Sequence, residues 1–417
     1  MTKKLRITVE RLQVGMSVVE LDRPWIDTPF LLQGFTIGNQ GDVRALQEHC
    51  NYIYIDPESM PIKARTNIKD KESEDTSKPG YFNNLYKNSI EVTTNTVEKE
   101  ISTANNVRNK TSGLVRTCMD DIVLGNAINE EELKKNITAT VESVVRNPDA
   151  MIWLTRLKEK DNRASMHSIN CCILSVAFGR FLRLPNVELA KLAISALMHD
   201  IGKLQIPTEI LNKPGKLNDH EFKQVCYHPT SSRNLLMSAG NYFISAVDVA
   251  YTHHERIDGS GYPRGLLGSA ISPFSRMLAI IDTYESMTNE QVYREELSPF
   301  ETLKYLNANR NTKYDEQLVK LFIKMIGVFP IGSIIELTTG QVGIVITSNR
   351  EDNLRPKILI MLDKNKLAGK REILNLARSN VDALGRPIKI KRTLRKGDYG
   401  IDQEQLMREG VEFTVLN

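Results

Sequence analysis

The clustering of histidine is the feature that most constrains how this chain can fold. Six of its seven histidines lie between residues 167 and 254, and they include the doublets His199-Asp200 and His253-His254. Each doublet adjoins a segment whose apolar residues recur at helical intervals, 187–198 for the first and 244–251 for the second. Such placement beside apolar helices is what a buried metal site requires. The pattern therefore predicts a helical domain built around a metal centre.

The donor types indicate which metals such a centre would hold. Imidazole and carboxylate are borderline-to-hard donors, which suit Fe, Mn or Zn. One isolated histidine is more simply explained as an ordinary surface or core residue, but here that explanation would have to hold for several at once. Adjacent helical residues point about 100° apart, so a doublet serves two neighbouring metals, or one metal and its surroundings, more easily than it chelates one ion. We expect six of the donors to be His167, His199, Asp200, His228, His253 and His254.

The seventh donor is expected to be Asp282. It follows the apolar run 277–281, where a carboxylate is half-buried and costly unless it is paired or bound to a metal. The alternative is an ordinary aspartate at a helix end or on the surface. His220 has polar neighbours and His49 lies in another domain, so neither is included.

Changes in residue pattern along the chain predict a mainly α fold in four parts. Residues 1–60 alternate apolar and polar residues between glycines, which is typical of a small β-rich domain. Residues 61–110 are rich in Lys, Asn, Ser and Asp and are expected to form a polar linker. Residues 111–330 have the helical period and contain the donors. Short strands return afterwards, so 331–417 is expected to be a C-terminal β-unit with a polar tail.

Composition and charge narrow the class of protein. A net charge of +4 favours a small anionic ligand and is too weak to indicate nucleic-acid binding. The five cysteines are odd in number and include no Cys-x-x-Cys pair, which suits a reducing compartment. The N-terminus lacks the apolar core of a secretory signal, and no run of about 18 apolar residues is present to span a membrane. We therefore expect a cytoplasmic protein.

Several motifs in the helical part resemble those of a known family. They are Met-His-Asp-Ile-Gly-Lys at 198–203, Asn-Lys-Pro-Gly-Lys-Leu at 212–217, His-Pro at 228–229 and His-His-Glu-Arg-Ile-Asp-Gly-Ser-Gly-Tyr-Pro-Arg-Gly-Leu at 253–266. In order and spacing they resemble the HD-GYP phosphodiesterases, which are named in part for the Gly-Tyr-Pro found here at 261–263. The resemblance extends from about residue 161 to about residue 327. The first 60 residues look like the small domain of unassigned function that often precedes HD-GYP domains in bacteria.

The resemblance implies an HD-superfamily helical bundle with two divalent metal ions, Fe or Mn, at its centre. Carried over by motif position, the metal ligands are the same seven donors, with Asp200 bridging the two ions. The implied activity is hydrolysis of cyclic di-GMP to linear pGpG, sometimes onward to GMP, while some members act on cyclic GMP-AMP. Some members hold a third metal with a glutamate whose position is Arg163 here, so we expect a two-metal centre.

This chemistry gives further residues expected roles. Two divalent ions about 3.5–4 Å apart share a hydroxide that attacks phosphorus, and Asp200 can give each ion one oxygen. Lys203 lies three residues later, where its ammonium would meet the phosphate oxygens unless it is an ordinary solvated lysine. Tyr262 is expected to contact substrate or to pack within its loop, and a purely structural loop is the alternative. Glu255 and Asp258 are expected to orient histidines.

One departure from the family pattern concerns the substrate. The family usually has two arginines downstream of the last aspartate, of which Arg294 keeps the second while Gln291 replaces the first. One bidentate phosphate contact would then be missing, so a preference for 3′,3′-cyclic GMP-AMP is the enzymatic alternative. A non-catalytic scaffold that binds cyclic dinucleotides is a second alternative, against which the complete ligand set argues. The Gly-Tyr-Pro segment argues against a di-iron oxygenase. Protein partners would bind through the N-terminal domain or the Gly-Tyr-Pro loop.

Overall fold

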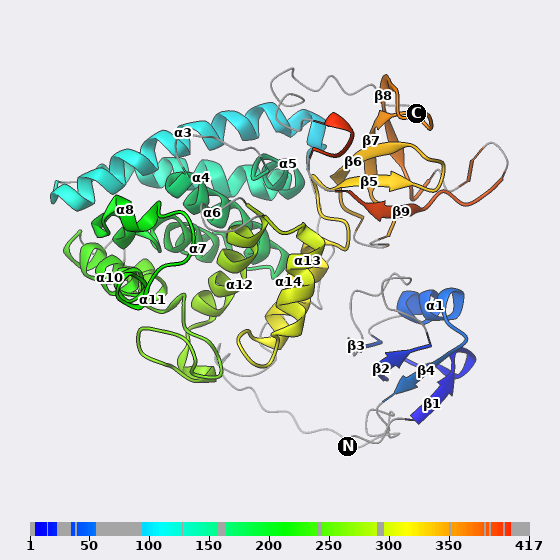
Figure 1. The fold of residues 1–417 in the computed structure, drawn as a ribbon, viewed down its shortest axis with the longest axis horizontal. Helices are drawn as coiled ribbons and strands as arrows, with labels where there is room; N and C mark the ends of the chain where they lie inside the picture. The colour runs from blue at the N-terminus through cyan, green and yellow to red at the C-terminus, as the bar shows by residue number, and fades with distance from the viewer. Residues whose placement is uncertain are drawn as a thin grey trace.

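Helices dominate the computed structural model, and a small sheet lies toward each end of the chain (Figure 1). The structure describes residues 5–14, 16–22, 35–37, 40–55, 94–126, 128–156, 163–239, 244–289, 296–349, 352, 354–378, 381–382, 385–394 and 397–401. The mainly α fold expected from the sequence is confirmed. Within these ranges, no helix combines the length and the apolar character needed to cross a bilayer.

An antiparallel sheet and one helix make up the N-terminal part. The strands are β1 (Leu5–Thr8), β2 (Ser17–Leu21), β3 (Phe35–Thr36) and β4 (Tyr52–Ile55), in the order β1-β4-β2-β3, and the helix is α1 (Gln40–His49). Alternate residues of β4 face inward, so that Ile53 and Ile55 are buried. With Leu46 of α1 they belong to a hydrophobic core separate from that of the helical part. The predicted β-rich N-terminal unit is therefore present.

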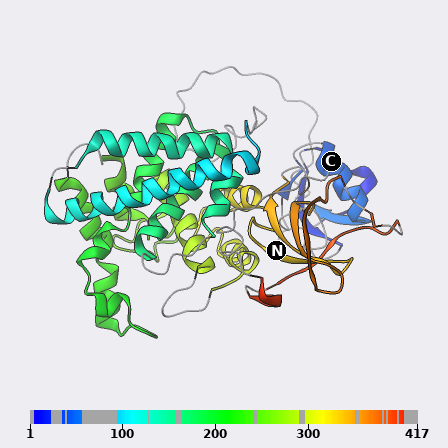
Figure 2. The same cartoon turned by 90° about the horizontal axis from the view of Figure 1, so that it is seen from above.

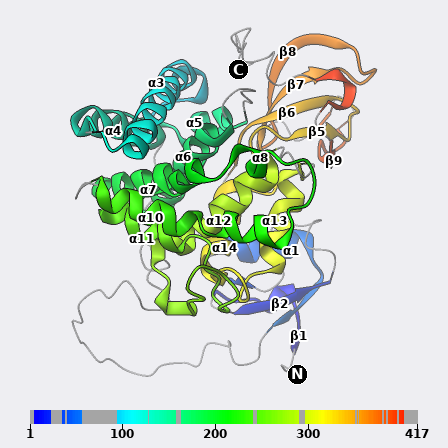
Figure 3. The same cartoon turned by 60° about the vertical axis from the view of Figure 1, so that its left-hand side comes forward.

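The helical part runs from α3 to α14. The helices are α3 (Val97–Leu124), α4 (Glu130–Arg146), α5 (Pro148–Leu154), α6 (Arg163–Phe181), α7 (Asn186–Met198), α8 (Thr208–Leu211), α9 (Asp219–Cys226), α10 (His228–Ser238), α11 (Ile244–Thr252), α12 (Pro273–Thr288), α13 (Pro299–Ala308) and α14 (Glu316–Ile326). A short 3₁₀ helix, η4 (Ile201–Gln205), follows α7. Figures 2 and 3 show α3 and α4 side by side along one flank of the bundle.

Helices α6 and α7 occupy the centre of the bundle because they are apolar on almost every side. Ile173, Phe178, Leu192 and Leu197 are all 0% exposed, and Ile280 of α12, which packs against α6, is equally buried. Burying one such side chain stabilises the fold by about 1.5–3 kcal/mol. The packed core fixes the position of every polar side chain that these helices carry inward.

The helical part begins earlier in the chain than predicted. Helix α3 starts at Val97, inside the segment 61–110 that was expected to be a linker. Val97, Ile101, Ala104 and Arg108 recur at helical intervals and face the main core, where three of them are buried and Ile101 is partly buried. This stripe is narrow, and the polar residues around it obscured the helical period.

A second antiparallel sheet closes the helical bundle (Figure 3). Its strands are β5 (Ile334–Leu337), β6 (Val342–Thr347), β7 (Lys357–Leu362), β8 (Ala368–Asn375) and β9 (Ile390–Thr393), in the order β8-β7-β6-β5-β9. Strands β5, β6 and β7 are largely buried on both faces, whereas the outer strands β8 and β9 are not. Ile334 and Ile344 join the core of the helices, whereas Ile335 and Val345 belong to a second small core. The predicted C-terminal β-unit is thus present and is packed onto the bundle.

Asp149 is an acidic group within this packed region, and its ionisation should oppose folding. It lies in the first turn of α5, and burial raises its pKa to about 7 although the backbone N–H of Ser348 and the charge of Lys357 lower it. A raised pKa means that the stability associated with the neutral carboxyl is present below about pH 4, the pKa of unfolded aspartate, and is lost as pH rises through the folded value.

We therefore predict that Asp149→Asn stabilises the protein more at pH 8 than at pH 5. The amide can still accept a hydrogen bond but does not ionise, so the difference in unfolding free energy between the two pH values should be on the order of a few kcal/mol. Urea unfolding of both proteins at the two pH values measures it. An equal effect of the substitution at both pH values would contradict the prediction.

Candidate metal centre

All seven predicted donors lie together inside the helical bundle. They come from α6, the end of α7 and the turn after it, the start of α10, the residues after α11, and α12: His167, His199, Asp200, His228, His253, His254 and Asp282. Their positions follow from the apolar helices that carry them, because the buried faces of α7 and α11 extend to Met198 and Thr252, the residues before the two doublets. Pro229 directly after His228 suits the first turn of α10.

The carboxylate of Asp200 contacts donors on two sides. Its Oδ2 lies 3.4 Å from Nε2 of His167 and 3.3 Å from Nε2 of His199. Its Oδ1 lies 3.1 Å from Nε2 of His228 and 3.6 Å from Nε2 of His253. Each oxygen of one carboxylate therefore faces a different pair of imidazoles.

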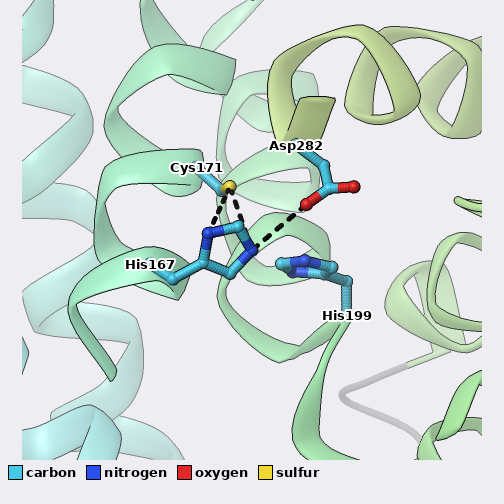
Figure 4. Close-up of side chains that lie close together, drawn as sticks. All are labelled: His167, Cys171, His199 and Asp282. Atoms are coloured by element: carbon cyan, nitrogen blue, oxygen red, sulfur yellow. Dashed lines mark hydrogen bonds and ion pairs between the residues drawn. The ribbon is translucent and has the colours of Figure 1, made fainter. Parts of the chain in front are cut away.

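Asp282 spans the centre in the same way. Its Oδ1 lies 3.2 Å from Nε2 of His167, a contact drawn in Figure 4, and its Oδ2 lies 3.9 Å from Nδ1 of His254. The donors accordingly fall into two groups, one around His167, His199 and Asp282 and the other around Asp200, His228, His253 and His254. Both aspartates reach from one group to the other.

Hydrogen bonds turn the imidazoles toward the centre. In His199, His228 and His253, Nδ1 donates to the carbonyl oxygen three residues earlier, at 2.9, 2.6 and 2.9 Å. A nitrogen that donates carries the proton, so Nε2 of each ring keeps its lone pair and points inward. This is how ring orientation and tautomer are fixed in metal-binding histidines.

Glu285 does the same for His167, a role that the sequence analysis did not assign. Its Oε2 accepts from Nδ1 of His167, and its Oε1 accepts from Nδ2 of Asn170 at 2.9 Å. Glu285 follows Asp282 by one turn of α12, so both face α6. That three-residue spacing was the sequence signal from which the contact could have been predicted.

Two buried atoms at the centre have no hydrogen-bond partner among the described residues. They are Nε2 of His199 and Oδ1 of Asp200. A buried polar atom without a partner typically costs about 1–3 kcal/mol. Both are lone-pair donors that face the centre, so the residues present fit a divalent cation.

The electrostatics of the centre suit ionised aspartates and, at His253 and His254, neutral imidazoles. Burial alone would raise the pKa of Asp200, but its neighbours, His199 and the charged Lys203 foremost, hold it well below its usual value. Burial lowers the pKa of His253 to about 4, and burial together with His253 lowers the pKa of His254. At neutral pH, the aspartate is therefore ionised and these two rings keep their lone pairs.

Cys171 is a further potential donor that the sequence analysis did not select. It belongs to the same group as His167, His199 and Asp282, whose ligand atoms all lie within 4.8 Å of one another (Figure 4). It follows His167 by one helical turn on α6 and is 0% exposed. The spacing was visible in the sequence, but a cysteine in an apolar helix is usually a core residue.

Lys203 and Tyr262 both contact the centre. Nζ of Lys203 donates to Oδ2 of Asp200 at 2.5 Å, and the side chain remains 31% exposed. The ring of Tyr262 lies against that of His254, with centroids 4.8 Å apart, and its hydroxyl hydrogen-bonds Cys226. Gln291, Arg294 and the side chain of Arg163, to which the sequence analysis also gave roles, lie outside the described residues.

The expectation that Glu255 and Asp258 orient histidines is wrong. Glu255 accepts hydrogen bonds from the backbone N–H groups of Arg264 and Leu266, at 2.7 and 2.9 Å, and so holds the Gly-Tyr-Pro loop. Asp258 accepts from the backbone and hydroxyl of Ser260 in the same loop. Backbone N–H groups of a loop have no partner in a helix or sheet and therefore need other acceptors. Both carboxylates serve as such acceptors here.

Two glycines permit close backbone approach near the centre. A Cβ at Gly202 would lie 2.3 Å from the carbonyl oxygen of His228, and one at Gly261 would lie 2.3 Å from the backbone nitrogen of Arg256. Ser232 strengthens the first contact, because its hydroxyl accepts from the N–H of Gly202 at 2.8 Å. These contacts hold η4 against α10 and fold the loop against the second doublet.

Comparison with known proteins identifies two domain families and several similar proteins. Residues 153–318 match the HD domain family, and residues 4–133 match a domain of unknown function, DUF3391. The cyclic di-GMP phosphodiesterase PA4108 of Pseudomonas aeruginosa is 31% identical over 384 residues, which are 90% of this chain and 89% of that protein. The 3′3′-cGAMP-specific phosphodiesterase 1 of Vibrio cholerae is 40% identical over 177 residues, 42% of this chain and 41% of that protein.

A further relative matches the helical part. The cyclic di-GMP phosphodiesterase PdeB of Borreliella burgdorferi is 28% identical over 207 residues, 50% of this chain and 54% of that protein. The match to PA4108 covers most of this chain, and the motifs at the two doublets lie at the candidate metal centre. The chain belongs to the HD-GYP family of HD-domain proteins, with a DUF3391 domain at its N-terminus.

Proposed function

We propose that this chain is a phosphodiesterase that hydrolyses cyclic di-GMP to linear pGpG with two divalent metal ions. The observation that carries the proposal is the arrangement of Asp200 and Asp282, each of which turns one oxygen to each of the two donor groups. Two cations held close together by shared carboxylates are the common solution for cleaving an anionic phosphodiester. The names of PA4108 and PdeB support the choice of substrate.

The donor set supports Fe or Mn as the metal, since it is mostly imidazole and carboxylate. When bound, the two ions would supply a nucleophile from water at neutral pH and would offset the charge of the phosphate. The protein's own contribution is to orient the ligands. Glu285 and the backbone carbonyl groups hold four rings in place before substrate arrives.

Lys203 and Tyr262 are proposed to meet the substrate. Lys203 is in contact with Asp200 yet partly exposed, so its ammonium can reach a non-bridging phosphate oxygen without leaving the centre. Tyr262 covers one face of His254 and thereby borders the same space. Arg294 is proposed as a second cation for the phosphates on the strength of the family resemblance alone. Burial of four of the five free cysteines accords with a cytoplasmic location.

Incubation of the purified full chain with Mn²⁺ or Fe²⁺ and cyclic di-GMP tests the proposed activity. We expect pGpG to accumulate, and Asp200→Asn to lower the rate by at least about a hundredfold, since even indirect partners of a metal ligand are worth 10–100-fold. Asp219→Asn, at an exposed acid in the first turn of α9, is the control and should retain full activity. Equal turnover by Asp200→Asn and wild type would refute the proposal.

The same assay distinguishes cyclic di-GMP from 3′,3′-cyclic GMP-AMP. Gln291 in the sequence and the 3′3′-cGAMP-specific relative favour the second substrate, but that relative matches 42% of this chain whereas PA4108 matches 90%. Cyclic di-GMP should therefore be consumed faster when the two are supplied separately at equal concentration. Faster loss of cyclic GMP-AMP would reverse the assignment of substrate without changing the proposed chemistry.

Lys203→Met is predicted to lower kcat roughly a hundredfold, as expected for loss of one charge-stabilising donor. Bound metal, measured by elemental analysis, should not change. Lys191→Met is a matched control, because Lys191 also pairs with an acid three residues earlier, Glu188, but on an exposed face. If Lys203→Met keeps its kcat, or loses its metal, Lys203 does not act on the phosphate.

A further inference from the structure

Cys171 faces the metal centre together with three of the proposed ligands. Its Sγ lies 3.8 Å from Nε2 and 3.9 Å from Nδ1 of His167. Figure 4 shows the sulfur, the His167 ring, the Asp282 carboxylate and the His199 ring bordering one space between α6, α7 and α12. One helical turn separates His167 from Cys171, so both side chains leave the same face of α6.

A second observation at the same place suits a bound cation. Nε2 of His199 is buried and has no hydrogen-bond partner among the described residues, while Nδ1 of that ring is already committed to the carbonyl oxygen of Ala196. The ring is 0% exposed, so no bulk water reaches it. Its inward lone pair belongs to the same group of ligand atoms as Sγ of Cys171.

The separation of the sulfur from His167 suits two ligands of one metal. Bonds of about 2.3 Å to sulfur and about 2.1 Å to imidazole nitrogen would place ligand atoms 3.8 Å apart at an angle of about 120° around the ion. That angle is close to tetrahedral.

We propose that Cys171 is a ligand of the metal ion held by His167, His199 and Asp282. The thiol proton leaves to solvent when the ion binds, and the sulfur lone pair forms the bond to the metal. This inference rests on the proposed two-metal function. It adds that the two metal positions have chemically different ligands. One has a sulfur donor, whereas the other, built from Asp200, His228, His253 and His254, has nitrogen and oxygen only.

A thiolate changes which ion the first position prefers. Sulfur is a softer donor than imidazole or carboxylate, so it favours Fe²⁺, Co²⁺ or Zn²⁺ over Mn²⁺. The second position has no such bias. The two positions should therefore differ in their relative affinity for Co²⁺ and Mn²⁺, and removal of the sulfur should make them more alike.

Cys172 provides a matched control on the same helix. It is the next residue of α6, 1% exposed, and directed about 100° away from Cys171 around the helix axis. It is not among the residues grouped at the centre. Cys171→Ala and Cys172→Ala each remove one sulfur atom from an almost fully buried position, so their effects on folding should be similar. Only Cys171→Ala should alter metal binding.

Absorption spectroscopy of the cobalt-substituted protein tests the proposal. The full chain is stripped of metal with a chelator and titrated with Co²⁺, and bound cobalt is counted by elemental analysis. A thiolate ligand gives an intense near-ultraviolet charge-transfer band from sulfur to cobalt, which nitrogen and oxygen ligands do not give. We expect the band in wild type and in Cys172→Ala, and its loss in Cys171→Ala with at least about a tenfold weaker affinity for the first cobalt ion.

The wild-type spectrum alone can overturn the proposal, so the test does not depend on whether Cys171→Ala folds. Cobalt bound to wild type without the band, or persistence of the band in folded Cys171→Ala, means that Cys171 is not a ligand, and failure of wild type to bind any cobalt would refute the metal position itself. The outcome is separate from that of the proposed function. A band without any turnover of cyclic di-GMP would support the ligand and refute the activity, and turnover without a band would do the reverse.

Discussion

The carboxylate of Asp200 is the constraint on which the rest of this centre depends. One of its oxygens faces His167 and His199, and the other faces His228 and His253. The backbone makes this possible, because Asp200 has φ −104° and ψ 7°, which ends α7 and turns the chain into η4. The tight contact of Gly202 with α10 then fixes the turn against His228.

Such a centre opposes folding, and the surrounding core has to offset it. Charged and polar groups taken out of water destabilise the protein unless they are paired or bound to metal. The hydrophobic residues of α6 and α7 are packed on almost every side and provide rigid support for donors that would otherwise repel or move apart. Hydrogen bonds to Nδ1 add to this support by fixing each ring before a metal binds.

Much of the fold and of the donor set could be predicted from the sequence because the relevant information was local. Doublets at the ends of apolar helices, and an aspartate after an apolar run, place donors in the interior whatever the tertiary details are. The exception in the fold was α3, whose buried stripe of Val97, Ile101 and Ala104 is too narrow to stand out among polar residues.

The contacts that could not be predicted depend on how separate elements meet. Cys171 sits in an apolar run, and only the approach of α12 and the end of α7 turns it from a core residue into a potential ligand. The position of α6 determines that Glu285 contacts His167, and the path of the loop at 264–266 determines that Glu255 binds backbone N–H groups there. The one-turn spacings of Cys171 from His167 and of Glu285 from Asp282 are visible in the sequence, but the segment that each side chain meets is set by the tertiary structure. That all seven donors bind metal remains a prediction.

Anomalous diffraction from crystals of the Mn²⁺-loaded protein tests the central claim most directly. If Asp200 joins two metal positions, two anomalous peaks about 3.5–4 Å apart will appear, one beside each oxygen of its carboxylate. A single peak, or peaks that share no contact with Asp200, would contradict the account.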